Sequence, residues 1–375
     1  MNLVEKKDKK IAVIIRNFSS HAGGAERYCV ELTSELAKNF PIKVYCQDST
    51  ESIKNICVRK VFKLSKPRFL NQLIFSALTY MLVRKKNYDI IHSHDMVSFA
   101  NVYSIHVPTI KSNIFSHNTL RKISLLLSPR ILSYLWLENR QMKVFKNKKK
   151  AVVAVSTLLK NNIVTHYPKV KAVTSIINPA LTHKSDVSEG NILEKYQIPK
   201  DAFLIIFVGH GFKRKGLQVL VNALERIQHI NPFLMVIGRG DQNQIKFSSK
   251  KIKLNTFFFG EVGNISDFYK ISDIMVHPTL GDTYGMAILE AMYYKTPVII
   301  SDEKYCGIAS ELDSSNSRKI SDPHDDLKIS KLILELYTNQ EVRSKLAMNS
   351  HIFAKNKNWE SVANNYLDVY SKIST

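Results

Sequence analysis

The sequence contains few cysteines, 4 in 375 residues. Cys29, Cys46, Cys57 and Cys306 lie far apart, with no CxxC spacing and no histidine pair nearby. This scatter argues against both a zinc finger and a disulfide framework. We therefore expect four buried free thiols, because an unpaired cysteine behaves as a small apolar residue.

Long apolar runs are also absent. A membrane-spanning helix needs about 20 apolar residues, and the nearest run, residues 73–83, contains Ser76 and Thr79 and is followed by three basic residues. The lysine-rich start MNLVEKKDKK leads directly into IAVII, without the apolar core or cleavage site of a signal peptide. These absences predict a cytoplasmic protein.

Acidic residues are scarce in the first half of the chain. Residues 1–180 contain 30 Lys or Arg and 10 Asp or Glu, whereas residues 181–375 contain 24 and 22. Nearly all of the net charge of +22 therefore lies in the first half. Such a surface attracts anions, whether nucleic acid, an acidic membrane or a phosphorylated acceptor.

Residues 111–150 hold ten of these basic residues and one acidic residue, interleaved with Leu, Ile, Phe, Tyr and Trp. The pattern is typical of a basic amphipathic segment at an anionic interface, and equally of ordinary helices with a solvated basic face.

The remaining pattern is that of a globular α/β protein. The chain is 45% apolar and 23% charged, and its length favours two domains. Strand-like segments alternate with helix-like segments up to about residue 180. The same alternation begins again at AFLIIFVGH, after the polar linker 178–190. We predict two doubly wound, Rossmann-like parallel-sheet domains facing a cleft: residues 1–180, with a helix over 358–375 packing back on them, and residues 181–357.

The turns that follow strands carry the residues suited to chemistry. Gly23 and Gly24 stand where the first strand gives way to a helix, and such glycines let backbone N–H groups approach an anion. The pattern is not GxGxxG. His92, His94 and His106 stand at the ends of later strands in the same half, without a carboxylate at metal-ligand spacing, so we predict no metal site there.

The first strand-to-helix turn of the second half is strongly basic. In VGHGFKRKGLQVL, Lys213, Arg214 and Lys215 precede the helix between Gly211 and Gly216. Cations at a helix amino terminus, where the helix dipole already favours negative charge, predict a phosphate site.

A second turn, in HPTLGDTYGMAILEAM, adds two carboxylates. Asp282 lies in the loop, and a helix is predicted to begin near Gly285, with Glu290 about one and a half turns inside it. The backbone N–H groups of Gly285, Met286 and Ala287 would donate hydrogen bonds to an anion, and Glu290 could hold a vicinal diol such as ribose. Asp282 could likewise hold sugar hydroxyl groups, or it could cap the loop or the helix. A diphosphate, a ribose and a sugar together indicate a nucleotide sugar.

With these motifs the sequence resembles the family 4 glycosyltransferases of GT-B fold, and most of all the lipopolysaccharide core glucosyltransferases. The resemblance extends over nearly the whole chain and rests on GGAER, YDIIHSHD, YSIHV, VGHGFKRKGL, IGRGD, FFFGEVGNISDFYKISDIMVHP, GDTYGMAILEAMYYKTPVIIS, YCG and WESVANNYLDVY.

The resemblance implies roles for individual residues. Gly23 and Gly24 would approach the donor phosphates, while Lys215 with Arg214 would neutralise the diphosphate leaving group. The backbone of Val262 would contact the base, and Glu290 would hold the ribose. Asp282 and the N–H groups of Gly285, Met286 and Ala287 would bind the donor sugar. His106 would lie against the transferred sugar.

Among these, His106, Lys215 and Asp282 are the implied catalytic residues. The implied reaction retains the anomeric configuration and uses neither a metal nor another cofactor. Two positions depart from the family pattern, since Asp282 stands where Glu is usual and His210 where Arg is frequent. The shorter Asp282 side chain is expected to alter sugar preference or activity.

The expected partners are a nucleotide sugar such as UDP-glucose, a glycan or lipid-linked acceptor such as lipopolysaccharide core, and the anionic inner face of the membrane, but no nucleic acid. Two alternatives remain open at this point: a nucleotide-sugar epimerase on the same fold, and a non-catalytic basic scaffold that binds membranes or nucleic acid.

Overall fold

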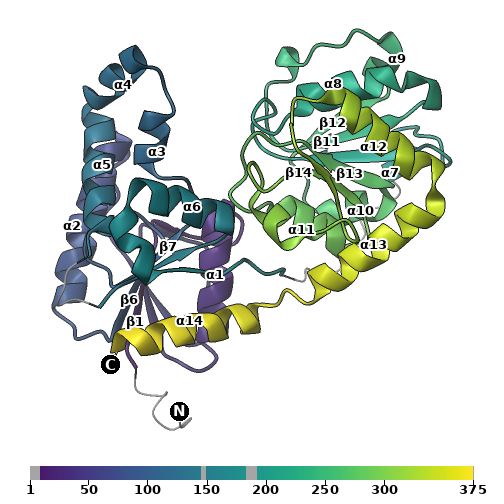
Figure 1. Cartoon of the computed structure of the whole chain (residues 1–375). Coiled ribbons are helices and arrows are strands. Elements are labelled where there is room, and N and C mark those ends of the chain that lie inside the picture. Colours follow the sequence, from purple (N-terminus) through teal and green to yellow (C-terminus); the bar gives the residue numbers. More distant parts are fainter. Residues whose placement is uncertain (1–8, 145–148, 183–191, 375) are drawn as a thin grey trace. The chain divides into compact units, whose positions relative to one another are not determined.

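The computed structural model describes residues 9–144, 149–182 and 192–374, and it divides into two compact units (Figure 1). Unit 1 comprises Met1–Ala180 and Asn358–Thr375, and unit 2 comprises Leu181–Lys357. Of the predicted linker, residues 183–190 lie outside the described residues.

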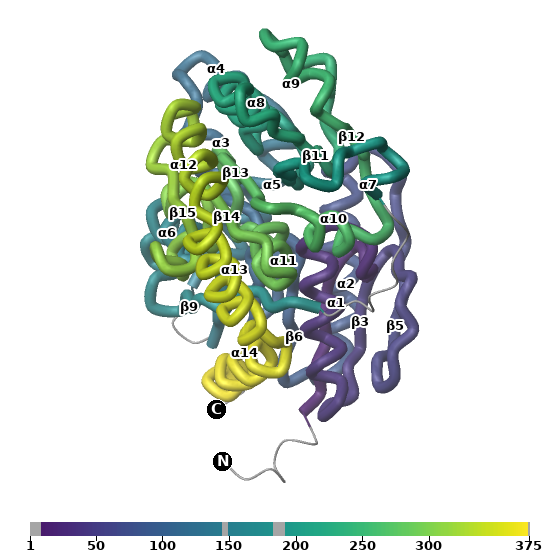
Figure 2. The backbone as a smooth tube through the Cα atoms, turned by 90° about the vertical axis from the view of Figure 1, so that its right-hand side faces the viewer, coloured from purple at the N-terminus to yellow at the C-terminus, as the bar shows by residue number. Residues whose placement is uncertain are grey.

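Unit 1 is built on a seven-stranded sheet in which all strands are parallel, in the order β5-β3-β1-β6-β7-β8-β9. Figure 2 shows β3 and β5 side by side at one edge. Every residue of β1 and β8 is buried, as expected for parallel strands covered on both faces. The strands are β1 (Ile11–Ile14), β3 (Ile42–Cys46), β5 (Ile56–Lys60), β6 (Ile90–Ser93), β7 (Val102–Ile105), β8 (Ala151–Ala154) and β9 (Thr174–Ile176).

Apart from the C-terminal helix α14, the helices of unit 1 connect these strands, and α4 and α5 project away from the sheet (Figure 1). The side chains of Thr109, Asn118 and Ser156 accept backbone N–H groups at the starts of α3, α4 and α6, which explains where these helices begin. The helices are α1 (Gly24–Leu36), α2 (Arg68–Arg84), α3 (Ile110–Phe115), α4 (Thr119–Leu126), α5 (Pro129–Met142), α6 (Thr157–His166) and α14 (Trp359–Ser374), and a two-stranded sheet joins β2 (Asn17–Phe18) to β4 (Asp48–Ser49).

Unit 2 is built on a six-stranded parallel sheet in the order β12-β11-β10-β13-β14-β15. Apolar residues of β10, β11 and β13 pack with those of α8 and α12 to form its core. The strands are β10 (Leu204–Val208), β11 (Phe233–Ile237), β12 (Thr256–Gly260), β13 (Ile274–His277), β14 (Val298–Ser301) and β15 (Arg318–Ile320).

Among the helices of unit 2, α8 packs against α12, and α11 packs against α13. The helices are α7 (Ile192–Lys195), α8 (Leu217–Arg226), α9 (Lys250–Leu254), α10 (Ile265–Ile271), α11 (Met286–Tyr293), α12 (Asp326–Thr338) and α13 (Gln340–Lys355). The prediction of two α/β units with parallel sheets is confirmed.

The prediction of four buried thiols is wrong for one of them. Cys29, Cys46 and Cys306 are buried, but Cys57 is exposed because it lies on the outward side of the edge strand β5. No helix in the described ranges is both long and apolar enough to cross a membrane.

Candidate functional site

The strand order of unit 2 places two predicted turns next to each other. The chain runs from β10 outward to β11 and β12, then returns to β13 on the other side of β10. Parallel α/β sheets bind ligands beyond the carboxyl ends of the strands at such a reversal. The turn after β10 carries Lys215 and the turn after β13 carries Asp282, so the site residues predicted for these turns meet at the reversal.

Backbone contacts hold these two turns together. The N–H of Leu280 donates to the carbonyl oxygen of Arg214 at 2.8 Å. Gly216 adopts a φ of +78°, and a Cβ at this position would collide with the carbonyl group of Pro278. Glycine is therefore needed here both for its backbone angle and for the close approach of the second turn.

Lys215 and Asp282 form an ion pair at this junction. The Lys215 residue is 7% exposed, and the Asp282 carboxylate is also 3.4 Å from the Nε2 atom of His277. Burial alone would raise the pKa of Asp282, but its contact with His277 and the charge of Lys215 outweigh burial and hold this pKa well below its ordinary value. Asp282 is thus a carboxylate at neutral pH.

His277 is a residue of the site that the sequence analysis did not identify. It ends the buried strand β13, is 1% exposed, and stacks on Phe207 at a centroid separation of 6.1 Å. Burial lowers the pKa of His277, so its imidazole is neutral at pH 7. The available signal was its position as the last residue of a strand and the first residue of the HPT motif.

The two other cations of the basic turn differ in their contacts. Arg214 donates through its guanidinium to the carbonyl oxygen of Gly281, so it braces the loop that carries Asp282. Lys213 is exposed. His210, which stands where the family often has Arg, accepts a hydrogen bond from the N–H of Arg239 at its Nδ1 atom, at 3.0 Å.

The helix predicted to begin near Gly285 is confirmed as α11, with Gly285 as its N-cap at a φ of +108°. Asp282 pairs with Cys306 of the YCG turn as a parallel bridge, which fixes the loop directly before the helix. The first backbone N–H groups of a helix have no acceptor within it, so those of Gly285, Met286 and Ala287 suit an anion.

Glu290 lies on α11 and is half-buried. The hydroxyl group of Tyr269, from α10, donates to its Oε2 atom at 3.4 Å. Val262 is half-buried in the loop between β12 and α10. The positions of both residues beyond the carboxyl side of the sheet are compatible with the roles predicted for them.

Unit 1 has its own reversal, between β1 and β6. Gly23 is the extended N-cap of α1 and Gly24 its first residue, in the connection that follows β1 and the short strand β2. A Cβ at Gly23 would meet the Oε2 atom of Glu26 at 2.7 Å, whereas one at Gly24 would have open space around it. The contact at Gly23 is with the end of a flexible side chain that can move aside, so the packing of the described residues requires glycine at neither position.

The three histidines of unit 1 form one cluster. The Nδ1 atom of His94 is 3.1 Å from the Nε2 atom of His106, and the rings of His92 and His94 lie 4.3 Å apart. Burial lowers the pKa of all three, that of His92 to about 3 and that of His106 to about 4. All three imidazoles are therefore neutral at pH 7.

Helix α14 closes the cluster. The hydroxyl group of Tyr370 lies 2.7 Å from His92 Nδ1, and that of Tyr366 lies 2.5 Å from Ser104 Oγ. Ser104 Oγ is in turn 2.8 Å from His92 Nε2. The C-terminal helix thus fixes the ring of His92 through both of its nitrogens.

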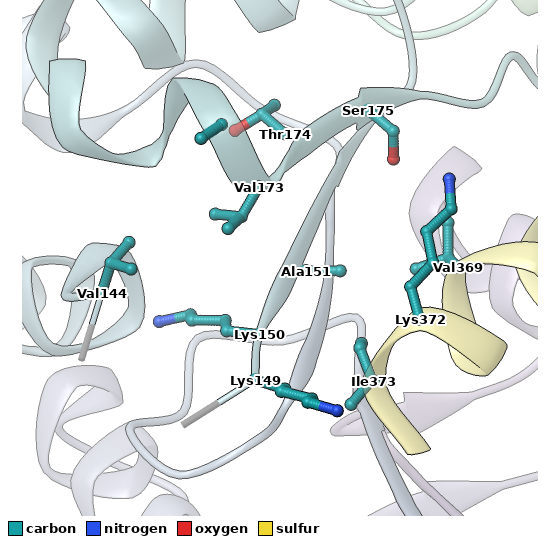
Figure 3. A pocket seen from close by; sticks show the side chains of 11 residues that line it. Val144, Lys149, Lys150, Ala151, Val173, Thr174, Ser175, Val369, Lys372 and Ile373 are labelled. Atoms are coloured by element: carbon teal, nitrogen blue, oxygen red, sulfur yellow. The ribbon is translucent and has the colours of Figure 1, made fainter. Parts of the chain in front are cut away.

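A separate hollow of about 640 Å³ lies at the amino-terminal ends of β8 and β9. Figure 3 shows that its three lysine side chains diverge, with the amine of Lys372 toward Ser175 and that of Lys150 toward Val144. They do not converge on one point as an anion site requires. Within the described ranges, no three His, Cys, Asp or Glu side chains are grouped as metal ligands.

Comparison with known proteins supports this fold and shows the family. The crystal structure of WaaG, a glycosyltransferase involved in lipopolysaccharide biosynthesis, superposes with a TM-score of 0.79 at 18% identity, over 96% of this chain and 99% of that one. Residues 22–181 match the family model Glycosyltransferase Family 4, and residues 188–352 match Glycosyl transferases group 1. The chain is a GT-B glycosyltransferase.

Relatives of this glycosyltransferase differ in how much of the chain they match. A glycosyltransferase of Methanocaldococcus jannaschii is 26% identical over 321 residues, 78% of this chain and 80% of the relative. The lipopolysaccharide glucosyltransferase WaaG of Escherichia coli strain K12 is 24% identical over 183 residues, 47% of this chain and about half of WaaG. The structure of Anabaena Alr3699/HepE in complex with UDP-glucose superposes with a TM-score of 0.67 at 16% identity, over 96% of this chain and 99% of that one.

Proposed function

We propose that this glycosyltransferase moves a hexose from a UDP-sugar, such as UDP-glucose, to a glycan or lipid-linked acceptor such as lipopolysaccharide core. The observation that carries the proposal is the Lys215–Asp282 pair at the strand reversal of unit 2, directly before the amino terminus of α11. The binding of UDP-glucose by the structural neighbour HepE and the activity named for WaaG support this choice of donor and acceptor.

In this proposal each group of the site meets one part of the donor. Lys215 and Arg214 neutralise the diphosphate, the N–H groups at the start of α11 bind the sugar or a phosphate oxygen, and Glu290 accepts hydrogen bonds from the ribose. Val262 meets the base through its backbone. From unit 1, Gly23 and Gly24 approach the phosphates, and His106 lies against the transferred sugar.

The ion pair with Asp282 gives Lys215 a second function in the proposed reaction. The ammonium group is held in place before the donor arrives, and the donor diphosphate then competes with Asp282 for it. Asp282, released in part, turns to the hydroxyl groups of the sugar. The charge that develops on the leaving diphosphate is stabilised by groups that are already positioned, which is the main source of catalytic power in such sites.

The proposed reaction retains the anomeric configuration. The bond between the anomeric carbon and the diphosphate oxygen breaks through an oxocarbenium-like state, and the acceptor hydroxyl attacks on the same face. Its proton passes to the departing phosphate. Lys215 and Arg214 supply the positive charge in this scheme, which accordingly calls for no metal ion or other cofactor.

Product analysis tests this function. The protein is incubated with UDP-glucose, UDP-galactose or GDP-mannose and lipopolysaccharide core as acceptor, and the new linkage is characterised by NMR. We expect transfer from a UDP-hexose with the α configuration kept, and loss of transfer in Lys215→Met. A β-linked product, or transfer only from GDP-mannose, would contradict the proposal.

We further propose that unit 1 docks on an anionic membrane surface through α3, α4 and α5. Seven large apolar side chains are exposed there, a set we call the α3–α5 face: Phe115, Leu120, Ile123, Leu126, Leu127, Leu132 and Trp136. Leu120 is 81% exposed and Leu127 is 75% exposed, and α4 has no buried residue at all. An apolar face of this size on a globular unit indicates a binding surface.

The charges around the α3–α5 face select an anionic partner. Basic side chains lie on the same helices, and Lys122 and Arg140 stack over the rings of Phe115 and Trp136. Glu138, the one acidic residue of 111–150, is 3% exposed. The described part of the face therefore carries positive charge without an exposed carboxylate, which complements anionic headgroups.

Liposome flotation tests the membrane proposal. We expect binding to vesicles that contain phosphatidylglycerol but not to pure phosphatidylcholine. Because burial of one leucine contributes about 1.5–3 kcal/mol, the double variant Leu120→Glu, Leu127→Glu should bind at least about tenfold more weakly. Met348→Glu, at an exposed position of unit 2, is the matched control. Equal flotation with neutral vesicles would contradict a charge-selective surface.

A further inference from the structure

We propose that His94 is a positioning residue that determines which ring nitrogen of His106 carries the proton. The inference rests on the proposed function in one respect, namely the placement of His106 against the transferred sugar. The two rings are nearly parallel, at an interplanar angle of 16° and a centroid distance of 5.4 Å. Their contact joins Nδ1 of His94 to Nε2 of His106 at 3.1 Å, which is a hydrogen-bond distance.

A bond between two neutral imidazoles contains one proton, so one ring must donate and the other accept. In the first arrangement, His94 carries its proton on Nδ1 and donates to His106. In the second, His106 donates from Nε2, and His94 must then carry its own proton on Nε2. The two arrangements differ at the buried Nε2 atom of His94, which carries no proton in the first and carries a proton in the second.

The surroundings of His94 Nε2 decide between them. This atom is inaccessible to solvent and has no hydrogen-bond partner among the described residues. His92, the nearest ring, uses its own nitrogens for Tyr370 and Ser104. The second arrangement would bury an N–H group without an acceptor, and buried orphan N–H groups are rarer in proteins than orphan acceptors.

The first arrangement therefore holds, and it fixes the protonation of His106. With Nε2 of His106 accepting from His94, the ring carries its proton on Nδ1. Apart from His94, no residue of the described chain forms a hydrogen bond with His106. His106 accordingly offers the N–H group at Nδ1 as a donor to an oxygen atom of its ligand, and it does not act as a base through Nδ1.

The assignment has a chemical consequence for the transferred sugar. A neutral imidazole that donates from Nδ1 can bind a hydroxyl or ring oxygen without adding positive charge beside an oxocarbenium-like carbon. The same ring in the opposite tautomer would present a lone pair at Nδ1, which repels a ring oxygen and can only accept a hydrogen bond from a hydroxyl group. His94 thus acts on the sugar through His106, without contacting the sugar.

The tautomer is measurable directly. Long-range proton–nitrogen NMR on the full chain labelled with ¹⁵N-histidine distinguishes protonated from unprotonated ring nitrogens. We expect His106 to be protonated on Nδ1 and His94 on Nδ1 in the ligand-free protein at pH 7. Protonation of His106 on Nε2 would overturn the proposal.

Two variants test whether His94 positions His106 or only contributes to packing. His94→Leu removes the donor, so the His106 signals should change to a mixture of both tautomers, and kcat/KM should fall about three- to tenfold, as for the loss of one hydrogen bond. His94→Asn keeps an N–H donor near the place of Nδ1 and should restore the single tautomer and most of the activity. An unchanged His106 spectrum in His94→Leu would overturn the proposal.

One outcome distinguishes this inference from the proposed function. If the tautomer changes in His94→Leu but transfer from UDP-glucose does not, the positioning of His106 by His94 is supported. The placement of His106 against the transferred sugar would then be wrong.

Discussion

The ammonium group of Lys215 and the carboxylate of Asp282 form an ion pair between two turns that are 67 residues apart in the sequence. The two residues were predicted to bind different parts of one donor, the diphosphate and the sugar. In the ligand-free protein they pair with each other, which holds the nearly buried side chain of Lys215 in place. Removing one partner of such a pair leaves an uncompensated charge.

The first prediction concerns the effect of acid on Asp282. Its pKa in the folded protein lies below the ordinary value of about 4 in the unfolded chain. Its contribution to stability is therefore complete above about pH 4, and it is lost as the pH falls toward the lower, folded-state pKa. Urea unfolding should show a smaller decrease in stability below pH 4 for Asp282→Asn than for the wild type, while Asp201→Asn, at an exposed position, should match the wild type. If the free energy of unfolding changes with pH in the same way for all three proteins, the result would count against the ion pair.

The histidine cluster predicts a second, separate pH window. The pKa values of His92 and His106 are lowered to about 3 and about 4 in the folded state, so the unfolded chain binds more protons below its ordinary histidine pKa of about 6.5. The free energy of unfolding of unit 1 should consequently decrease as the pH falls from about 6.5 to about 4. His92→Leu should flatten this part of the curve. A wild-type stability that is constant across this window would show that the histidines are not buried as described.

The third prediction concerns the contribution of Tyr370, on α14, to the stability of unit 1. Tyr370→Phe removes the hydroxyl group that contacts His92 Nδ1 at 2.7 Å and leaves a buried nitrogen without its partner. The expected loss in the free energy of unfolding is about 1–3 kcal/mol. Tyr337→Phe, at an exposed tyrosine of unit 2, should change the stability by less than about 0.5 kcal/mol. Equal effects from the two substitutions would refute the role of this contact.

The fourth prediction is that replacing Glu290 weakens the affinity for UDP. Replacing a carboxylate by an amide removes a charged acceptor worth about 1.5–3 kcal/mol, so Glu290→Gln should weaken UDP binding by about tenfold or more in calorimetry. Glu303→Gln, at an exposed carboxylate of the same unit, serves as the control. Affinity for UDP equal to that of the wild type would place the ribose elsewhere.

Local patterns were sufficient to predict much of this protein. The buried apolar runs predicted β1, β10, β11 and β14, and Gly285 predicted the start of α11, because glycine at a positive φ can end a loop and cap a helix.

Contacts between distant residues were not predictable in the same way. The pairing of Lys215 with Asp282 depends on β10 and β13 being neighbours, a property of strand order that no local pattern contains. His277 was missed for the same reason, since its role depends on the Asp282 side chain beside it. The exposure of Cys57 likewise follows from β5 being an edge strand.

The most direct test of the central claim is thermal stability in the presence of nucleotides. A ligand that binds only the folded state raises Tm by mass action. We predict that UDP and UDP-glucose raise the Tm of the wild type and of Lys213→Met, an exposed neighbour, more than GDP or ADP do, and that Lys215→Met and Glu290→Gln lose this shift. If no nucleotide shifts the wild type, or if Lys215→Met responds to UDP as the wild type does, the donor site is not formed by these residues.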